Sequence, residues 1–191
     1  MTQWVRVLAP LAVAVLTACY PPVTSRPVGT TVGLRPDPAL RGDWKGVNES
    51  GEPGYFHFLF QSDGTITAVI VASGPKAEDW NVATLTTAKL GANRIMNARL
   101  VLSNGKEENA PAGTVPVLYR IDPHGTLTLA LMDEAKVKRA IADGKINGEV
   151  EGGAAGDATI AGDAKALDSF FASPDAARLF DRPFFTLHKV N

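Results

Sequence analysis

From residue 40 onward, apolar side chains recur at every second position, which is the period of β-strands. Tyr55 to Phe60 alternates in this way, and Thr65 to Val71 follows after Asp63-Gly64. An Asp-Gly pair between two apolar runs is typical of a two-residue hairpin turn. Such a turn pairs Phe60 with Thr67, Phe58 with Val69 and His57 with Ile70.

Both faces of this predicted hairpin are apolar. Phe56, Phe58, Phe60, Val69 and Val71 share one face, and Tyr55, His57, Leu59, Ile66 and Ile70 share the other. Strands that are apolar on both faces are usually buried on both. We therefore expect the hairpin to be covered on either side.

Two further hairpins follow. Trp80–Leu90 and Asn93–Leu102 flank a turn at Gly91-Ala92. After a polar loop from Ser103 to Pro116, the alternating segments 117–121 and 127–131 flank Asp122-Pro123-His124-Gly125, whose residues suit a type I turn.

The C-terminal part mixes helices with short strands. Asp133 is expected to cap a helix that runs to Asp143, with Gly144 as its left-handed stop. Asp163 is expected to cap a second helix. Ser173-Pro174 is typical of the start of a short helix, here running to Phe180. Residues 145–150 and 158–161 are expected to form short strands, and residues 184–190 a closing strand.

The predicted fold class is mainly β: an antiparallel sheet of eight to ten strands or a barrel, with two or three short helices in the C-terminal half. Such a sheet must close or cover its edges. Gly42-Asp43-Trp44 then resembles the Gly-x-Trp of lipocalins and related calycins. The resemblance implies a calycin-like barrel plugged at one end by Trp44, with Arg178 or Arg182 stacked on that ring.

The N-terminus carries a targeting signal. Arg6 precedes an apolar run from Val7 to Leu16, which is too short for a permanent membrane span and suits the core of a secretory signal. Leu16-Thr17-Ala18-Cys19 resembles the lipobox of bacterial lipoproteins, and the globular part resembles small proteobacterial lipoproteins. The resemblance implies cleavage before Cys19, a diacylglyceryl group on its sulfur and an acyl chain such as palmitate on its amino group. Tyr20, where an Asp would favour the inner membrane, favours the outer membrane and the periplasmic face of the cell envelope.

These features divide the chain into three parts. Residues 1–18 are the expected signal peptide, residues 19–39 the lipidated cysteine and a tether, and residues 40–191 one β-rich globular domain. The tether prediction depends on five prolines, Pro21, Pro22, Pro27, Pro36 and Pro38, because such segments are extended and semi-rigid.

The composition excludes several classes of function. The 191 residues carry 19 Lys and Arg against 20 Asp and Glu, which excludes a polybasic nucleic-acid binder. One cysteine cannot form a multi-cysteine zinc site. The sequence also lacks the Gly-x-Ser-x-Gly motif of hydrolases, the His-Glu-x-x-His motif of zinc enzymes and the Gly-x-x-x-x-Gly-Lys-Ser/Thr loop that binds phosphate. We expect no enzyme, no cofactor, no metal and no nucleic-acid partner.

Two functions fit this pattern. In the first, the barrel binds a small apolar ligand, and Tyr55, His57 and Tyr119 supply the few polar groups that such a pocket needs. An interior filled solidly by Phe56, Phe58 and Phe60 would exclude it. The alternative is a structural or protein-interaction module of the envelope, without ligand or catalysis, that uses the tether and the polar loop 103–116.

Overall fold

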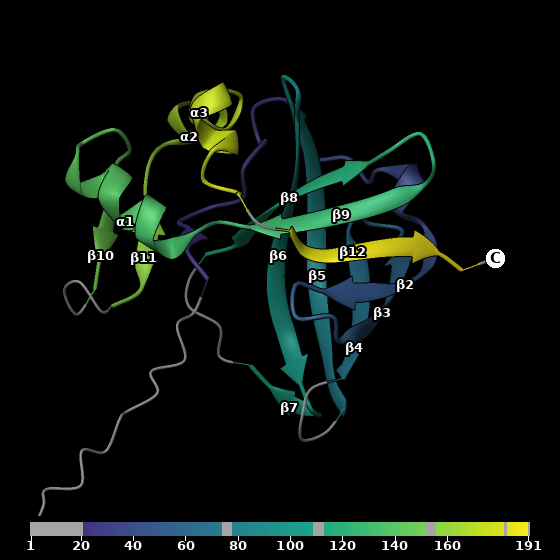
Figure 1. Cartoon of the computed structure of the whole chain (residues 1–191). Helices are drawn as coiled ribbons and strands as arrows, with labels where there is room; N and C mark the ends of the chain where they lie inside the picture. Colours follow the sequence, from purple (N-terminus) through teal and green to yellow (C-terminus); the bar gives the residue numbers. More distant parts are fainter. Residues whose placement is uncertain (1–20, 74–77, 109–112, 152–155, 182, 191) are drawn as a thin grey trace, which may run out of the picture.

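Eight antiparallel strands close into a barrel in the computed structural model, which describes residues 21–73, 78–108, 113–151, 156–181 and 183–190. Around the barrel the order is β2, β3, β4, β5, β6, β8, β9 and β12, and β12 lies between β9 and β2 (Figure 1). Pairing of β5 with β6 completes the ring. The bounds are β2 Gly42–Asn48, β3 Pro53–Phe60, β4 Ile66–Ser73, β5 Glu78–Leu90, β6 Asn93–Ser103, β8 Val115–Ile121, β9 Thr126–Leu131 and β12 Pro183–Lys189. The predicted fold class is confirmed, and the fold is consistent with a calycin-like barrel.

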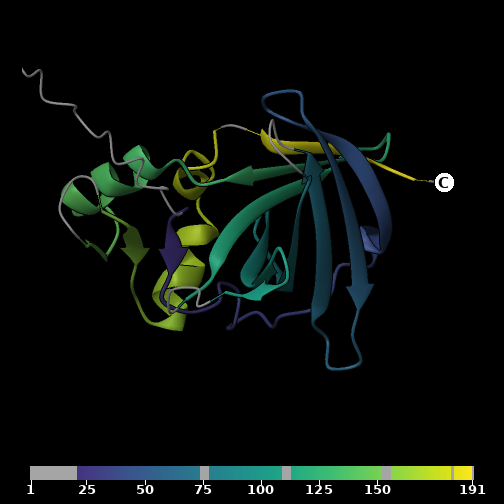
Figure 2. The same cartoon turned by 90° about the horizontal axis from the view of Figure 1, so that it is seen from below.

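A second, smaller layer lies beside the barrel in both views (Figures 1 and 2). Its sheet has the order β1 Val23–Thr24, β11 Ala158–Ile160 and β10 Gly148–Val150, with β1 parallel to β11. Helices α1 Glu134–Ala142, α2 Ala164–Phe171 and α3 Pro174–Ala177 belong to the same layer. A short strand, β7 Lys106–Glu107, also pairs with the end of β6.

The helices begin at the predicted caps. The side chains of Asp133, Asp163 and Ser173 each accept a hydrogen bond from the backbone N–H three residues later. These bonds satisfy donors that the first turn of a helix leaves without partners. α3 is shorter than predicted, since it ends at Ala177.

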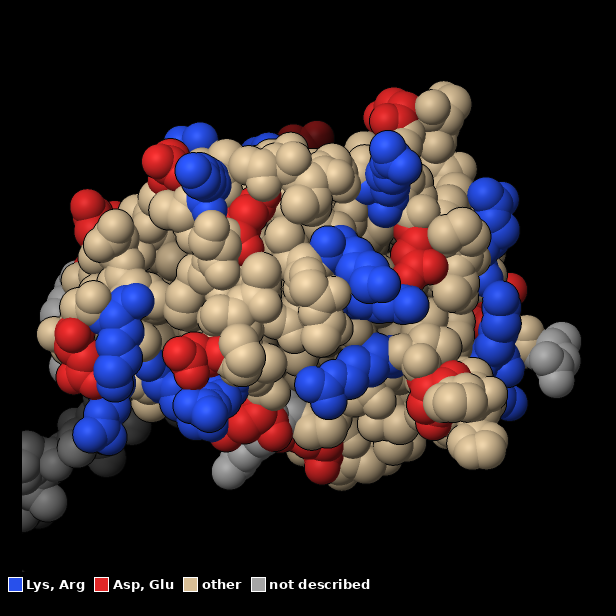
Figure 3. All heavy atoms as spheres, turned by 90° about the horizontal axis from the view of Figure 1, so that it is seen from above, with Lys and Arg blue, Asp and Glu red and all other residues tan. Residues whose placement is uncertain are grey.

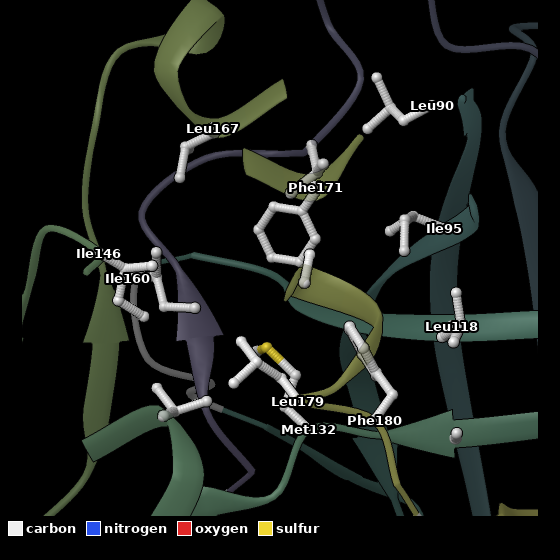
Figure 4. Close-up of a cluster of buried hydrophobic side chains, with 14 of the residues drawn as sticks. Leu90, Ile95, Leu118, Met132, Ile146, Ile160, Leu167, Phe171, Leu179 and Phe180 are labelled. Atoms are coloured by element: carbon white, nitrogen blue, oxygen red, sulfur yellow. The ribbon is translucent and has the colours of Figure 1, made fainter. Parts of the chain in front are cut away.

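The buried apolar side chains form two clusters, one between the layers and one inside the barrel. The first lies between the outer wall of the barrel and the small layer, where Leu90, Ile95 and Leu118 of the barrel face the side chains of the helices and of β11 (Figure 4). Phe171 of α2 is fully buried in this cluster. The second cluster lines the barrel interior and includes Phe56, Phe58, Leu127 and Leu187.

One end of the barrel is plugged from within. The 3-10 helix η1, Pro38–Leu40, places Leu40 under the barrel, where it is fully buried beside Trp44. The Trp44 Nε1–H donates to the Leu40 carbonyl at 2.8 Å. This is the end that Trp44 was predicted to plug.

Among the described residues, the cation over Trp44 is Lys189 rather than Arg178. Lys189 Nζ lies 5.7 Å from the centre of the Trp44 rings, because β12 runs beside β2 and pairs Lys189 with Trp44. Arg178 instead forms an ion pair with Asp175, and Arg182 lies outside the described residues.

The register of the first hairpin differs from the prediction by one residue. Phe60 pairs with Ile66 and Phe58 with Ala68, because the loop contains five residues rather than two. Gln61 and Thr65 close it through a backbone bond at 2.9 Å, and the Asp63 carboxylate accepts the Thr65 N–H. A shift of one residue exchanges the two faces of a strand, so Ile66, Ala68 and Ile70 face inward with the phenylalanines.

The described part of the predicted tether, residues 21–39, does not extend away from the domain but packs against it. Val28 is fully buried, and its backbone N–H donates to the Asn97 side chain at 2.7 Å. Further along, the backbone N–H groups of Gly29 and Thr31 donate to the carboxylate of Asp168 on α2. This segment is therefore a docked strap that belongs to the folded domain, whereas Cys19 lies outside the described residues.

Candidate functional site

The barrel interior holds a cavity of about 540 Å³ between the plug and the opposite end. Phe56, Phe58, Leu85, Met96 and Val117 are among the residues that line it. Pockets that bury small ligands have volumes of roughly 300–1,000 Å³ and mainly apolar walls. The phenylalanines therefore do not fill the interior, and the condition that would have excluded a ligand is not met.

Small side chains create this space. Inward positions on β4, β5 and β6 are occupied by Ala68, Ala72, Ala83 and Ala98, which all line the cavity. Because these positions carry alanine, the interior beside Phe56 and Phe58 keeps volume that larger side chains would occupy. The same four alanines alternate with outward residues, and this is the signal in the sequence that could have predicted a cavity.

Only two of the residues lining the cavity within the described chain have polar side chains, Asn48 and Asn81. The Asn48 amide is held by its own loop, because its Nδ2 donates to Glu52 and its Oδ1 accepts the N–H groups of Ser50 and Glu52. Asn81 is half-buried near the start of β5. Its amide is the group at the cavity best placed to meet the polar end of a ligand.

The mouth of the cavity lies opposite the plug. There the outermost lining residues are Asn48 at the end of β2, Asn81 near the start of β5, Leu100 near the end of β6 and Phe184 at the start of β12. Pro21 also lines the cavity. The strap thus starts at the mouth and leads to the plug at Leu40.

Two of the three predicted ligand contacts lie on the outer wall. Tyr55 is 56% exposed, and His57 points to the same side of β3. The His57 Nδ1 pairs with the Asp43 carboxylate of β2. Both side chains line a surface groove of about 400 Å³ rather than the barrel cavity.

The outer wall of this hairpin is not covered as predicted. Tyr55, Val71 and Trp80 stand opposite one another on β3, β4 and β5. Tyr55 and Trp80 are exposed and Val71 is half-buried, so the described residues leave this face open.

The third predicted contact, Tyr119, points inward but lies by the plug. Its hydroxyl donates to Asp37 at 3.0 Å, and Arg94 donates to the same carboxylate oxygen at 3.0 Å. Burial, and next the nearby Asp37 charge, raise the pKa of Tyr119 well above its ordinary value. This trio fastens the strap to β6 and β8, at the edge of a second groove of about 410 Å³.

The remaining histidines do not join the site. His124 lies in an exposed turn and His188 is exposed on β12. Within the described ranges, no group of three or more His, Cys, Asp or Glu side chains is arranged to hold a metal ion.

Charges are mixed on the face seen from above, where lysines and arginines alternate with acidic side chains (Figure 3). That face thus presents both signs close together, in keeping with the net charge of −1 of the chain.

No protein-family model, curated protein or solved structure matches the chain. Of the helices in the described residues, none is long and apolar enough to cross a bilayer.

Proposed function

We propose that this protein is an envelope lipoprotein that binds a small apolar molecule inside its barrel. The proposal is carried by the cavity of about 540 Å³, whose walls are apolar apart from two asparagines. Burial of apolar ligand surface against such walls yields roughly 25 cal/mol per Å² before the costs of association are subtracted. A binding role, without catalysis or cofactor, fits a cavity with so few polar groups.

The same proposal includes a lipid anchor on Cys19 at the periplasmic face of the envelope, in the outer membrane. Its support is the sequence from Arg6 to Cys19, which combines a charged start, an apolar run and a lipobox-like ending. Two or three acyl chains would hold the protein stably at the surface, whereas one would not. Mass spectrometry of wild type and Cys19→Ser, after membrane fractionation, tests this part: the wild type should carry the acyl mass and the variant should lose it.

Native mass spectrometry of residues 20–191, exported to the periplasm and purified without detergent, tests the binding role. The expected spectrum contains a reproducible adduct of low mass that disappears on denaturation. A spectrum of bare protein, together with no uptake of added oleic acid, would refute the binding role.

A further inference from the structure

We propose that the cavity takes the acyl chain of a membrane phospholipid directly from the leaflet that anchors the protein, through a mouth that lies against that leaflet. This inference rests on the binding role proposed above and names the ligand class and its source.

The membrane-bound end of the chain joins the domain at the mouth. Pro21 lines the cavity, and Cys19 precedes it by two residues. Consecutive Cα atoms are 3.8 Å apart, so two residues of chain reach at most about 7.6 Å. A lipid on Cys19, or the apolar run before it, therefore enters the bilayer beside the mouth.

The strap prevents the domain from moving away from that point. Residues 21–39 do not act as a spacer, because Asp168, Asn97 and Arg94 bind the strap along its length, Arg94 through the Asp37 carboxylate. A free tether of 21 residues would allow every orientation of the barrel, whereas a docked strap removes that freedom from Pro21 onward. The mouth is thereby kept close to the membrane surface.

The rim of the mouth carries apolar side chains that suit a bilayer surface. Val47, Trp80 and Val101 each neighbour a mouth-lining residue and point outward, and Phe184 lies on the rim itself. All four are at least 39% exposed. Tryptophan and phenylalanine at such a rim enter the interfacial region readily, where their rings are partly desolvated.

Charge does not provide this contact. At the mouth end, Glu49, Glu52, Asp79, Glu107 and Glu108 carry negative charge, and Lys106 carries positive charge. Such a rim is repelled by anionic headgroups. Contact through apolar side chains therefore predicts that added salt does not weaken binding to the bilayer.

Tryptophan quenching tests the orientation. The full chain, with Trp4→Phe in every sample, is reconstituted into phosphatidylcholine vesicles with or without bromine on the acyl chains. Trp80 lies at the mouth, whereas Trp44 is buried at the plug and does not line the cavity. Brominated lipid should quench at least twofold more of the fluorescence in the parent than in Trp80→Phe. Equal fractional quenching would overturn the inference.

A matched pair of rim variants tests the route. Val101 is 39% exposed at the mouth end, and Val190 is 41% exposed at the plug end. Val101→Asp should reduce phospholipid uptake from the vesicles at least fivefold, as counted by native mass spectrometry, whereas Val190→Asp should stay within twofold of the parent. Equal uptake by both variants contradicts the inference.

The binding role can fail separately. A protein that takes up free oleic acid from solution but shows equal quenching in the parent and in Trp80→Phe retains the binding role and refutes the membrane route. Absence of uptake from both oleic acid and vesicles refutes both.

Discussion

Replacing Asp168 by Asn should detach the strap from α2 and destabilise the protein. The carboxylate is 3% exposed and accepts three hydrogen bonds: from the Gly29 N–H at 2.5 Å, the Thr31 N–H at 2.8 Å and the Thr31 hydroxyl at 2.5 Å. An asparagine keeps one acceptor oxygen but points an NH₂ group at donors. The variant must therefore lose the bond from the Gly29 N–H or the bond from the Thr31 N–H, whereas the Thr31 hydroxyl can accept from the new NH₂ group.

The magnitude follows from the charge and the burial. Hydrogen bonds to a charged group contribute about 1.5–3 kcal/mol each, and a buried donor without a partner costs about 1–3 kcal/mol. Thr31 is exposed, so water replaces part of what its groups lose, whereas Gly29 is buried. We expect Asp168→Asn to lower the free energy of unfolding by about 2–4 kcal/mol.

Asp163→Asn on the same helix is the matched control. Asp163 is exposed and caps α2 through the Ala166 N–H, and Asn caps helices about as well as Asp. Its effect should stay within about 0.5 kcal/mol.

Urea unfolding followed by circular dichroism measures both variants, and amide hydrogen exchange reports on the strap. Exchange at Gly29 should become faster in Asp168→Asn and stay unchanged in Asp163→Asn. Equal unfolding midpoints for the two variants would refute the claim that the strap, residues 21–39, belongs to the folded domain, and with it the argument that the strap keeps the mouth at the membrane.

Three further results are expected. Tyr119→Phe should lower the free energy of unfolding by about 1–2 kcal/mol by removing the bond to Asp37. Because the folded-state pKa of Tyr119 is raised, this contribution is full below the unfolded pKa of about 10 and is lost as the pH rises beyond it. Urea titrations at alkaline pH should therefore show a smaller loss of stability in the variant than in wild type. Gly46→Ala should destabilise the barrel seam by at least about 2 kcal/mol in thermal unfolding, since an added Cβ would lie within 2.8 Å of the β12 backbone at Leu187. Asn81→Leu should weaken binding of oleic acid more than that of a hydrocarbon of equal length, by titration calorimetry, and an equal change for both would contradict a role in meeting the polar end.

The sequence predicts most of the barrel because its signals are local. Alternation of apolar positions, the Gly91-Ala92 turn and the 122–125 turn gave the second and third hairpins at their observed places. Helix caps at Asp133 and Asp163 were equally readable, since a cap depends on residues three positions apart.

The errors have non-local or side-chain causes. Asp63-Gly64 fits a two-residue turn and a longer loop alike, and the Asp63 bond to Thr65 selects the longer one. With the predicted register, Val69 and Val71 share a face with the phenylalanines. In the observed register they lie on the outer wall, and alanines of β4 line the cavity instead. The strap was missed because Gly29 meets Asp168 across 139 residues, which no local pattern reveals.

The most direct test of the binding role is a titration of the cavity with a fluorescent fatty acid. Ala83 lies on the cavity wall and is 5% exposed, so Ala83→Phe should fill part of the space while the barrel keeps its circular dichroism spectrum. Met96→Leu, a change of similar volume on the same wall, is the control. We predict saturable binding by wild type and Met96→Leu, and at least tenfold weaker binding by Ala83→Phe. Saturable binding of equal strength in all three proteins would place the ligand elsewhere and contradict the account.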